Sequence, residues 1–155
     1  MVVSVKLRIK SLINKDREVE VEAGVNSHYP ALLGPDEPEI LLPVDVAEKL
    51  DLYPPRSDWD TVERMSVGGL AIGWFVKRAL SVCVVEEDRI GPEIIAHAYI
   101  VLGFPKVLIS DAAIKPLGIW TVDEARGYWC FSDELRDVLD GKRKPRESYK
   151  AERKV

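Results

Sequence analysis

The chain has 155 residues, 46% of them hydrophobic and 31% charged, which is long enough for one buried core and unlike a disordered protein. Its net charge of −4 is unevenly placed, because residues 141–155 hold seven Lys/Arg against two Asp/Glu, leaving −9 on residues 1–140. An acidic body repels phosphate, so only the basic end could contact nucleic acid. We predict a single domain over residues 1–140 and a basic C-terminal tail over 141–155.

The composition indicates a cytoplasmic protein adapted to heat. No apolar run is long enough to span a bilayer, and the alternating start of the chain does not resemble a signal peptide. The chain has no Gln and only two Asn, beside many Glu, Lys and Arg, as is typical of thermophiles. Thermophile interiors can hold disulfides, so Cys83 and Cys130 either pair or are ordinary core residues. Their spacing from the two histidines fits no metal site, and we expect no cofactor.

The first half of the chain predicts a hairpin, a loop and a short helix. Residues 3–9 and 19–25 alternate between apolar and polar side chains, which is typical of two half-buried strands joined by a turn. Residues 26–39 contain three prolines and a glycine, which favours an irregular loop. Pro43 can begin a helix over residues 44–50, because the missing N–H of proline costs nothing at the first helical position.

The second half predicts further strands and two more short helices. Apolar or alternating runs indicate strands at residues 61–66, 70–78, 79–85, 94–102, 107–109, 119–122 and 128–131. Gly68-Gly69 fits the tip of a hairpin between the first two. Asp111 is a good N-cap for a brief helix ending at Gly118, and Ser132 for a last helix over 133–140. Without a repeat or a long linker, the chain reads as one mostly β domain with two or three short helices.

Three short motifs carry a resemblance to a known family. Leu42-Pro43 leads into Ala47-Glu48-Lys49-Leu50, Leu108-Ile109 leads through a helix to Leu117-Gly118-Ile119, and residues 64–77 look like a flap hairpin. Over residues 3–130 the chain resembles the retropepsin-like aspartic proteases, in which a strand delivers Asp-Thr-Gly to a cleft covered by the flap. The resemblance implies a retropepsin-like (acid protease) closed β-barrel. It also implies a homodimer, because a single lobe leaves half a cleft and an open sheet edge.

The resemblance places the family's Asp-Thr-Gly on Glu22-Ala23-Gly24, so Glu22 is the candidate catalytic residue. The family needs two carboxylates close enough to share a proton, and glutamate is one methylene longer than aspartate. Ala23 lacks the hydroxyl that joins the two active-site loops, Ser110 stands where the family has glycine, and the loop 26–39 is much longer than in the family. The candidate substrate-binding residues are Ala23, Gly24, Asn26, Gly68, Gly69 and Trp74.

These departures favour a non-catalytic retropepsin-fold protein that binds a peptide, a partner chain or a small ligand. One alternative is an active aspartic-type peptidase that uses a Glu22 pair across the homodimer. A second is a β-barrel interaction or nucleic-acid module acting through the basic tail. Glu22 is also one of three alternating glutamates, which are usually solvated on the polar face of a strand. His97, in an apolar strand, fits a core histidine with its hydrogen bonds satisfied.

Overall fold

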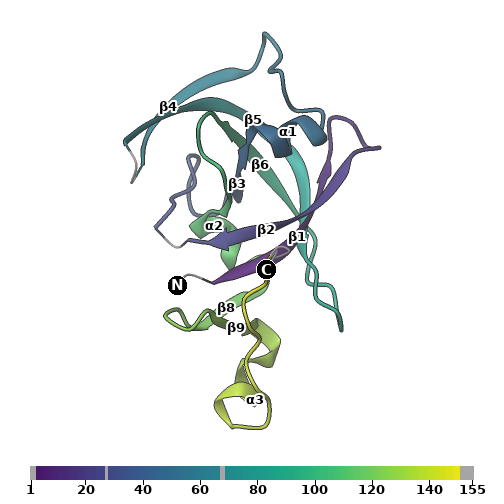
Figure 1. The fold of residues 1–155 in the computed structure, drawn as a ribbon, viewed down its shortest axis with the longest axis vertical. Helices are drawn as coiled ribbons and strands as arrows, with labels where there is room; N and C mark the ends of the chain where they lie inside the picture. Colours follow the sequence, from purple (N-terminus) through teal and green to yellow (C-terminus); the bar gives the residue numbers. More distant parts are fainter. Residues whose placement is uncertain (1–2, 27, 67–68, 151–155) are drawn as a thin grey trace, which may run out of the picture.

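The computed structural model describes residues 3–26, 28–66 and 69–150, and within them the chain is mostly β with a few short helices (Figure 1). The elements are β1 (Ser4–Ser11), β2 (Glu18–Val25), β3 (Glu39–Pro43), α1 (Val44–Lys49), β4 (Asp60–Ser66), β5 (Gly69–Val84), β6 (Ile94–Val101), β7 (Val107–Ile109), α2 (Asp111–Ile114), β8 (Ile119–Asp123), β9 (Tyr128–Phe131), the 3₁₀ turn η1 (Ser132–Glu134) and α3 (Leu135–Leu139). The predicted mostly β class is confirmed.

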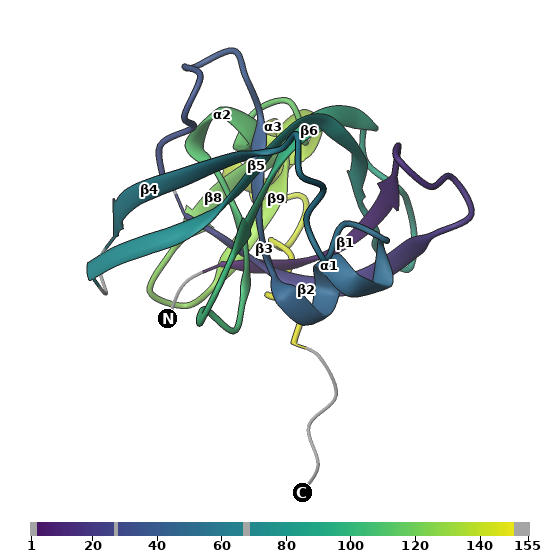
Figure 2. The ribbon, with the colours of Figure 1, turned by 90° about the horizontal axis from the view of Figure 1, so that it is seen from above.

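Six of the strands form a closed barrel. They follow the order β1-β2-β7-β3-β6-β5, and β1 pairs with β5 to close it. Strand β4 lies outside the barrel and pairs only with β5, so that the two form a hairpin that projects beyond the barrel (Figures 1 and 2). Strands β2 and β7 are parallel neighbours, so residues 23–25 lie beside residues 107–109.

The core is built by the alternation visible in the sequence. Val5, Leu7 and Ile9 on β1 are fully buried, while Lys6 and Arg8 between them face outward and pair with Glu20 on β2. Burying a side chain of this size stabilises the fold by roughly 1.5–3 kcal/mol. The interior is completed by large side chains that are fully buried: Ile40, Leu42, Leu50, Leu52, Leu80, Ile100, Ile109, Leu117, Trp129 and Phe131.

Two predicted strands are in fact one. The predicted strands 70–78 and 79–85 are joined, up to Val84, in the continuous 16-residue strand β5, which contains a register shift between Val76 and Leu80. Arg78 takes φ 51° at this bulge, and it is exposed together with Lys77. A bulge lets a strand turn charged side chains outward and then resume pairing. The apolar pattern of the sequence is therefore interrupted at Lys77 and Arg78, although the strand itself continues through them.

Two boundaries also differ from those predicted. Glu39 begins β3 instead of ending the loop, because its backbone continues the parallel ladder to His97 on β6. The helix at residue 111 has only four residues, and its N-cap is Ser110, with Asp111 as its first helical residue.

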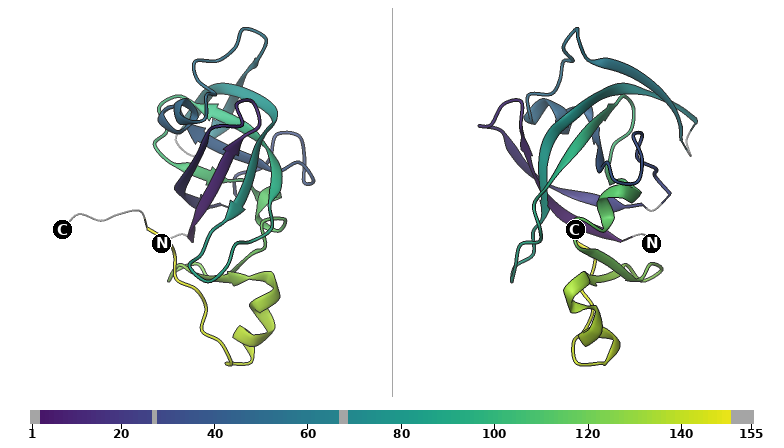
Figure 3. Two further views of the ribbon diagram at one scale, coloured as in Figure 1. Left: turned by 90° about the vertical axis from the view of Figure 1, so that its right-hand side faces the viewer. Right: turned by 180° about the vertical axis from the view of Figure 1, so that it is seen from behind.

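Much of the basic C-terminal segment is packed on the body of the same chain. The backbone of Arg146 bridges to Trp129 on β9 in both directions (3.0 and 2.6 Å), and the N–H of Tyr149 donates to the carbonyl of Ser4 on β1 (2.9 Å). Together with β8, β9 and α3, this segment lies at the end of the molecule away from the β4–β5 hairpin (Figures 1 and 3).

Within the described residues, no helix is long and apolar enough to cross a membrane. Cys83 and Cys130 are both buried free thiols. Of the two alternatives that the sequence left open, a disulfide or ordinary core residues, the structure therefore shows core residues. Burial raises the pKa of both thiols, which keeps them protonated and unreactive at neutral pH.

Candidate functional site

A second, smaller core lies between the β4–β5 hairpin and the barrel. We call it the tyrosine cluster: Tyr29, Leu41, Phe75, Tyr99 and Val101, with Val62, Ala71 and Leu108 packed against it. Its residues come from the loop after β2 and from five strands, and the Tyr99 hydroxyl shares its hydrogen between the carbonyls of Val62 and Ala71 (both 3.2 Å). These bonds hold the two hairpin strands down on the barrel.

A fully buried carboxylate lies beside the tyrosine cluster. Glu39 is 0% exposed, and its carboxylate accepts hydrogen bonds from the Tyr29 hydroxyl, from Arg64 on β4 and from the backbone N–H of Leu32 (2.8 Å). A buried charge is tolerated only when it is paired and its lone pairs are occupied, and here both conditions are met. Glu39 therefore joins the hairpin, the loop and the barrel at one point.

Arg64 is the cation of this arrangement. Its guanidinium pairs with Glu39, donates to the carbonyl of Pro30 (2.5 Å), and lies 5.4 Å from the Tyr29 ring and 4.8 Å from the Tyr99 ring. Stacking against two aromatic faces is a typical role of arginine in desolvated sites. The side chain is thus enclosed by the loop on one side and the barrel on the other.

The protonation states in this cluster follow from burial and charge. Burial, and after it the negative charge of Glu39, raises the pKa of Tyr29 well above its ordinary value. Burial alone would lower the pKa of Arg64, but the hydrogen bond and charge of Glu39 outweigh it, and the net change is upward. At neutral pH Tyr29 is therefore a phenol that donates, and Arg64 is a cation.

The structure places the candidate triplet Glu22-Ala23-Gly24 inside a strand. Glu22 is exposed on the outer face of the barrel, opposite Lys6 in the β1–β2 ladder. Ala23 is fully buried in the main core, so its side chain faces away from solvent. Gly24 pairs with Leu108, and a Cβ on Gly24 would lie 3.1 Å from Leu108 Cδ2. These three residues do not form a common exposed surface.

The position directly after β2 belongs to Asn26. Its N–H donates to the carbonyl of Ile109 (3.4 Å), and its side-chain oxygen accepts the N–H of His28 (2.9 Å). Because Val25 pairs with Ile109, Asn26 is level with Ser110 at the end of β7. Glu22 lies four residues back along the strand, about 13 Å away at the usual rise per residue.

Ser110, which replaces the family's glycine, is fully buried and hydrogen-bonded. Its hydroxyl accepts the N–H of Glu39 (3.0 Å), and its own N–H donates to the carbonyl of Glu39 (3.1 Å). This reciprocal pair fixes the start of β3 against the end of β7. The serine side chain thus has a structural role at the position where the resemblance expects none.

The remaining candidates lie on the hairpin. Gly68 is outside the described residues, and Gly69 begins β5 with φ 109°, a backbone conformation that favours glycine. Trp74 is half-buried, and its ring packs edge-on against Tyr53 with 5.8 Å between centroids. Trp74 packs against the main core and not in the tyrosine cluster.

His97 is a core histidine with both ring nitrogens engaged. Its Nδ1 accepts the backbone N–H of Arg78 (2.9 Å), and its Nε2 lies 3.5 Å from the carboxylate of Glu37. The ring also packs against Phe75, with centroids 5.4 Å apart. Because an accepting Nδ1 carries no proton, the hydrogen of the neutral ring sits on Nε2 and points to Glu37.

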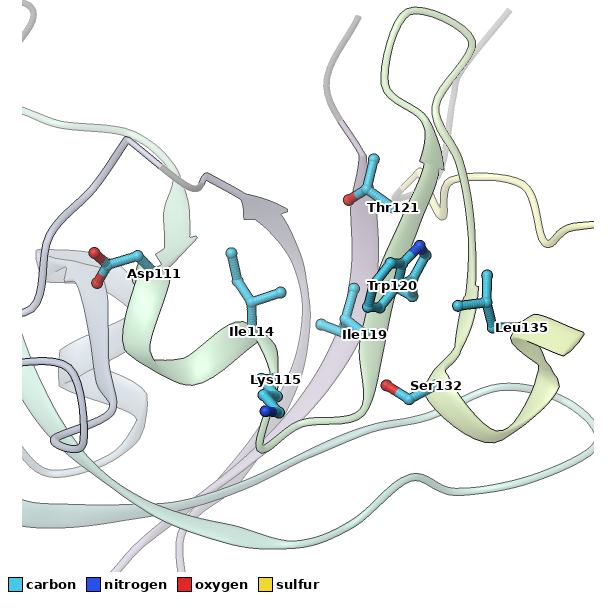
Figure 4. A pocket seen from close by; sticks show the side chains of 8 residues that line it. All are labelled: Asp111, Ile114, Lys115, Ile119, Trp120, Thr121, Ser132 and Leu135. Atoms are coloured by element: carbon cyan, nitrogen blue, oxygen red, sulfur yellow. The ribbon is translucent and has the colours of Figure 1, made fainter.

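An open pocket of about 470 Å³ lies between α2 and the β8–β9 unit, at some distance from the hairpin (Figure 4). Figure 4 shows Ile114 of α2 and Ile119 of β8 on its two sides, with Trp120 and Leu135 beyond. Its walls are mostly apolar, with Lys115 and Asp111 at the α2 side. It is an accessible hollow that the sequence did not predict.

Sequence reasoning missed the residues that form the most enclosed polar arrangement, Tyr29, Glu39, Arg64 and Tyr99. The available signals were weak: Tyr29 is the one aromatic residue of the loop 26–39, and Glu39 directly precedes an apolar run. Arg64 alternates with Met65 and Glu63 in a strand and looks like a surface residue.

Among the residues that the structure describes, no group of three or more His, Cys, Asp or Glu side chains is placed to hold a metal ion. Around Arg64 and Glu39 the site offers hydrogen bonding, charge and aromatic rings. The chain matches no known protein-family model and shows no detectable similarity to a curated protein.

Proposed function

We propose that the chain is a non-catalytic protein with a retropepsin-like fold that binds a peptide or a partner chain. The observation that carries this proposal is the residue at the end of β2. Asn26 stands there, level with Ser110, and a carboxamide can neither ionise nor take a proton from water as an aspartate does. The nearby Glu39 carboxylate is fully buried and paired with Arg64, so it is not available to activate water.

The filled space beneath the hairpin supports the same proposal. In the family that the chain resembles, substrate lies between the flap and the barrel. Here the tyrosine cluster and the Arg64–Glu39 pair occupy the region under β4 and β5. A polypeptide substrate could enter only if these side chains moved first.

The outer face of the hairpin is suited to binding a partner. Met65 and Leu70 form a cross-strand pair that is 80% and 58% exposed, and Ile72 follows on the same face. Adjacent exposed apolar side chains on a projecting hairpin are typical of interaction surfaces.

The two alternatives have less support. Glu22 is exposed and could meet Glu22 of a second copy, but it lies on the ion-paired outer face and not at a strand end. The basic segment has part of its charge compensated, because Arg143 and Arg146 both pair with Asp88 and Glu134. Compensated arginines contribute little to phosphate binding.

A protease assay tests the proposal. Wild type, Glu22→Gln and Asn26→Asp are incubated with unfolded protein and a peptide library from pH 3 to pH 7 at raised temperature. We expect no cleavage by wild type or Glu22→Gln. Cleavage by wild type that Glu22→Gln abolishes would replace this proposal with the Glu22-pair hydrolase. Asn26→Asp introduces a carboxylate level with Ser110, and we expect this variant to stay inactive because the space under the hairpin is filled.

We further propose that the chain forms a homodimer, as its resemblance implies. Sedimentation analysis at micromolar concentration should give twice the chain mass of 17.4 kDa. A clean monomer at that concentration would exclude any mechanism in which two copies share a carboxylate pair.

A further inference from the structure

Neighbouring residues bind the backbone of the segment Tyr29–Leu32 on two sides. On one side, the carbonyl of Tyr29 accepts the N–H of Asp111 (2.8 Å), and the N–H of Ala31 donates to the Asp111 carboxylate (3.0 Å). On the other, Arg64 of β4 donates to the carbonyl of Pro30 (2.5 Å). Proteins that recognise extended peptides use main-chain bonds of this kind for affinity and a pocket for one side chain for specificity.

The side chains of this segment are of two kinds, one buried and the others exposed. Tyr29 is buried in the tyrosine cluster, whereas Leu32 and the following Leu33 are 42% and 43% exposed. A core segment would bury its leucines as well. One buried aromatic anchor with exposed neighbours is the arrangement of a bound peptide.

The pocket for Tyr29 is built by elements that do not depend on the segment. Leu41, Phe75, Tyr99 and Leu108 lie on β3, β5, β6 and β7, which pair with one another in the barrel. The Tyr99 hydroxyl holds the base of the hairpin through Val62 and Ala71. The strand pairing of the barrel does not use this segment, so displacing Tyr29 would leave an aromatic pocket beside Arg64, with Arg64 still paired to Glu39.

We propose that Tyr29–Leu32 is an internal ligand that occupies a peptide-binding site made by Arg64, Asp111 and the other residues of the tyrosine cluster, and that an extended peptide with a tyrosine or phenylalanine anchor displaces it. This inference rests on the proposed binding function and names the site and the class of ligand. A tethered segment acts at an effective concentration of about millimolar, so a competing peptide binds weakly until the segment is loosened.

The test uses a synthetic peptide copy of residues 28–34, blocked at both ends, and a matched peptide in which the tyrosine is replaced by alanine. Binding is measured by calorimetry to wild type, to Tyr29→Ala, and to Tyr128→Ala as a control on β9. We expect the copy to bind Tyr29→Ala at least about tenfold more tightly than it binds wild type or Tyr128→Ala. The alanine peptide should bind none of them. Equal binding of the copy to all three proteins, or none to a folded Tyr29→Ala, would overturn the inference.

If Tyr29→Ala does not fold, amide hydrogen exchange on the wild-type protein tests whether the segment Tyr29–Leu32 leaves its site. We expect the amides of Ala31 and Leu32 to exchange through a local opening, faster than the amide of Val25 in the core of the sheet. If all three amides exchange only when the whole protein unfolds, the segment does not leave its site in the folded state and the inference is wrong. The outcome is separable from the proposed function: cleavage of the peptide copy refutes the non-catalytic proposal, whereas intact but unbound peptide refutes only the internal ligand.

Discussion

The guanidinium of Arg64 on β4 and the fully buried carboxylate of Glu39 on β3 form an ion pair that connects the projecting hairpin to the barrel. The pair is separated by 25 residues of sequence and is completed by the Tyr29 hydroxyl and the N–H of Leu32. Together with the bonds from the Tyr99 hydroxyl to Val62 and Ala71, the pair holds the hairpin against the barrel.

Replacing Arg64 tests this dependence. Arg64→Leu leaves Glu39 buried without its cation, and we expect the free energy of unfolding to fall by roughly 3–5 kcal/mol. The matched control is Arg8→Leu, which breaks an exposed ion pair with Glu20 and should cost much less, because solvent screens such a pair. Guanidinium unfolding curves measure both. Similar losses for the two variants would mean that the buried pair does not hold the hairpin.

Replacing Arg146 should release the C-terminal segment. Arg146 makes a two-bond contact with Asp88 (2.7 and 2.9 Å) and two bonds to Glu134 (2.9 and 2.6 Å), and it stacks on Phe131. We expect Arg146→Ala to make trypsin cleavage after Lys142 and Arg143 at least about tenfold faster, because cleavage follows the opened population. Arg126→Ala, which breaks an exposed contact with Asp123, is the control and should leave the rate unchanged.

The same cluster predicts a pH dependence. The hydrogen bonds from Arg146 lower the pKa of Asp88. Burial raises the pKa of Glu134, but the bonds from Arg146 and the N–H of Phe131 outweigh it, and the net change is downward. A lowered folded-state pKa gives stability that is present above the unfolded values, near 3.8 and 4.5, and is lost as the pH falls through the folded ones.

Wild type and Arg146→Ala should therefore differ most in midpoint of unfolding at pH 6 to 7. The difference should shrink steadily below about pH 4 as the two carboxylates take up protons. Denaturant curves at half-unit pH steps measure this. A constant difference down to pH 2 would show that Arg146 stabilises the fold by packing alone.

Two glycines of the barrel, Gly73 on β5 and Gly24 on β2, give different predictions. A Cβ on Gly73 would lie 2.2 Å from the carbonyl oxygen of Ile100 and 2.9 Å from a ring carbon of Tyr99, so Gly73→Ala must separate β5 from β6. We expect a loss of at least about 2 kcal/mol. A Cβ on Gly24 would meet only the end of the Leu108 side chain at 3.1 Å, which can shift, and Gly24→Ala should cost no more than about 1 kcal/mol. Thermal unfolding compares the two.

The elements that depend on local pattern could be predicted from the sequence. The β1–β2 hairpin follows from strict alternation, and α1 follows from Pro43 ahead of a short helical run. The register of β2 against β7 could not be predicted, because a period-two pattern fixes which face a residue takes and not which residue it meets on the neighbouring strand. Only the pairing of Val25 with Ile109 shows that Asn26, and not Glu22, is level with Ser110.

The candidate site was decided by tertiary structure. In the sequence Glu39 closes a polar, proline-rich loop, and by composition it belongs in solvent. It is buried because Arg64, Tyr29 and the N–H of Leu32 reach its carboxylate in the folded chain. The free energy of burying a charge depends on which partners surround it, and those partners come from a distant strand and a folded loop that no local pattern specifies.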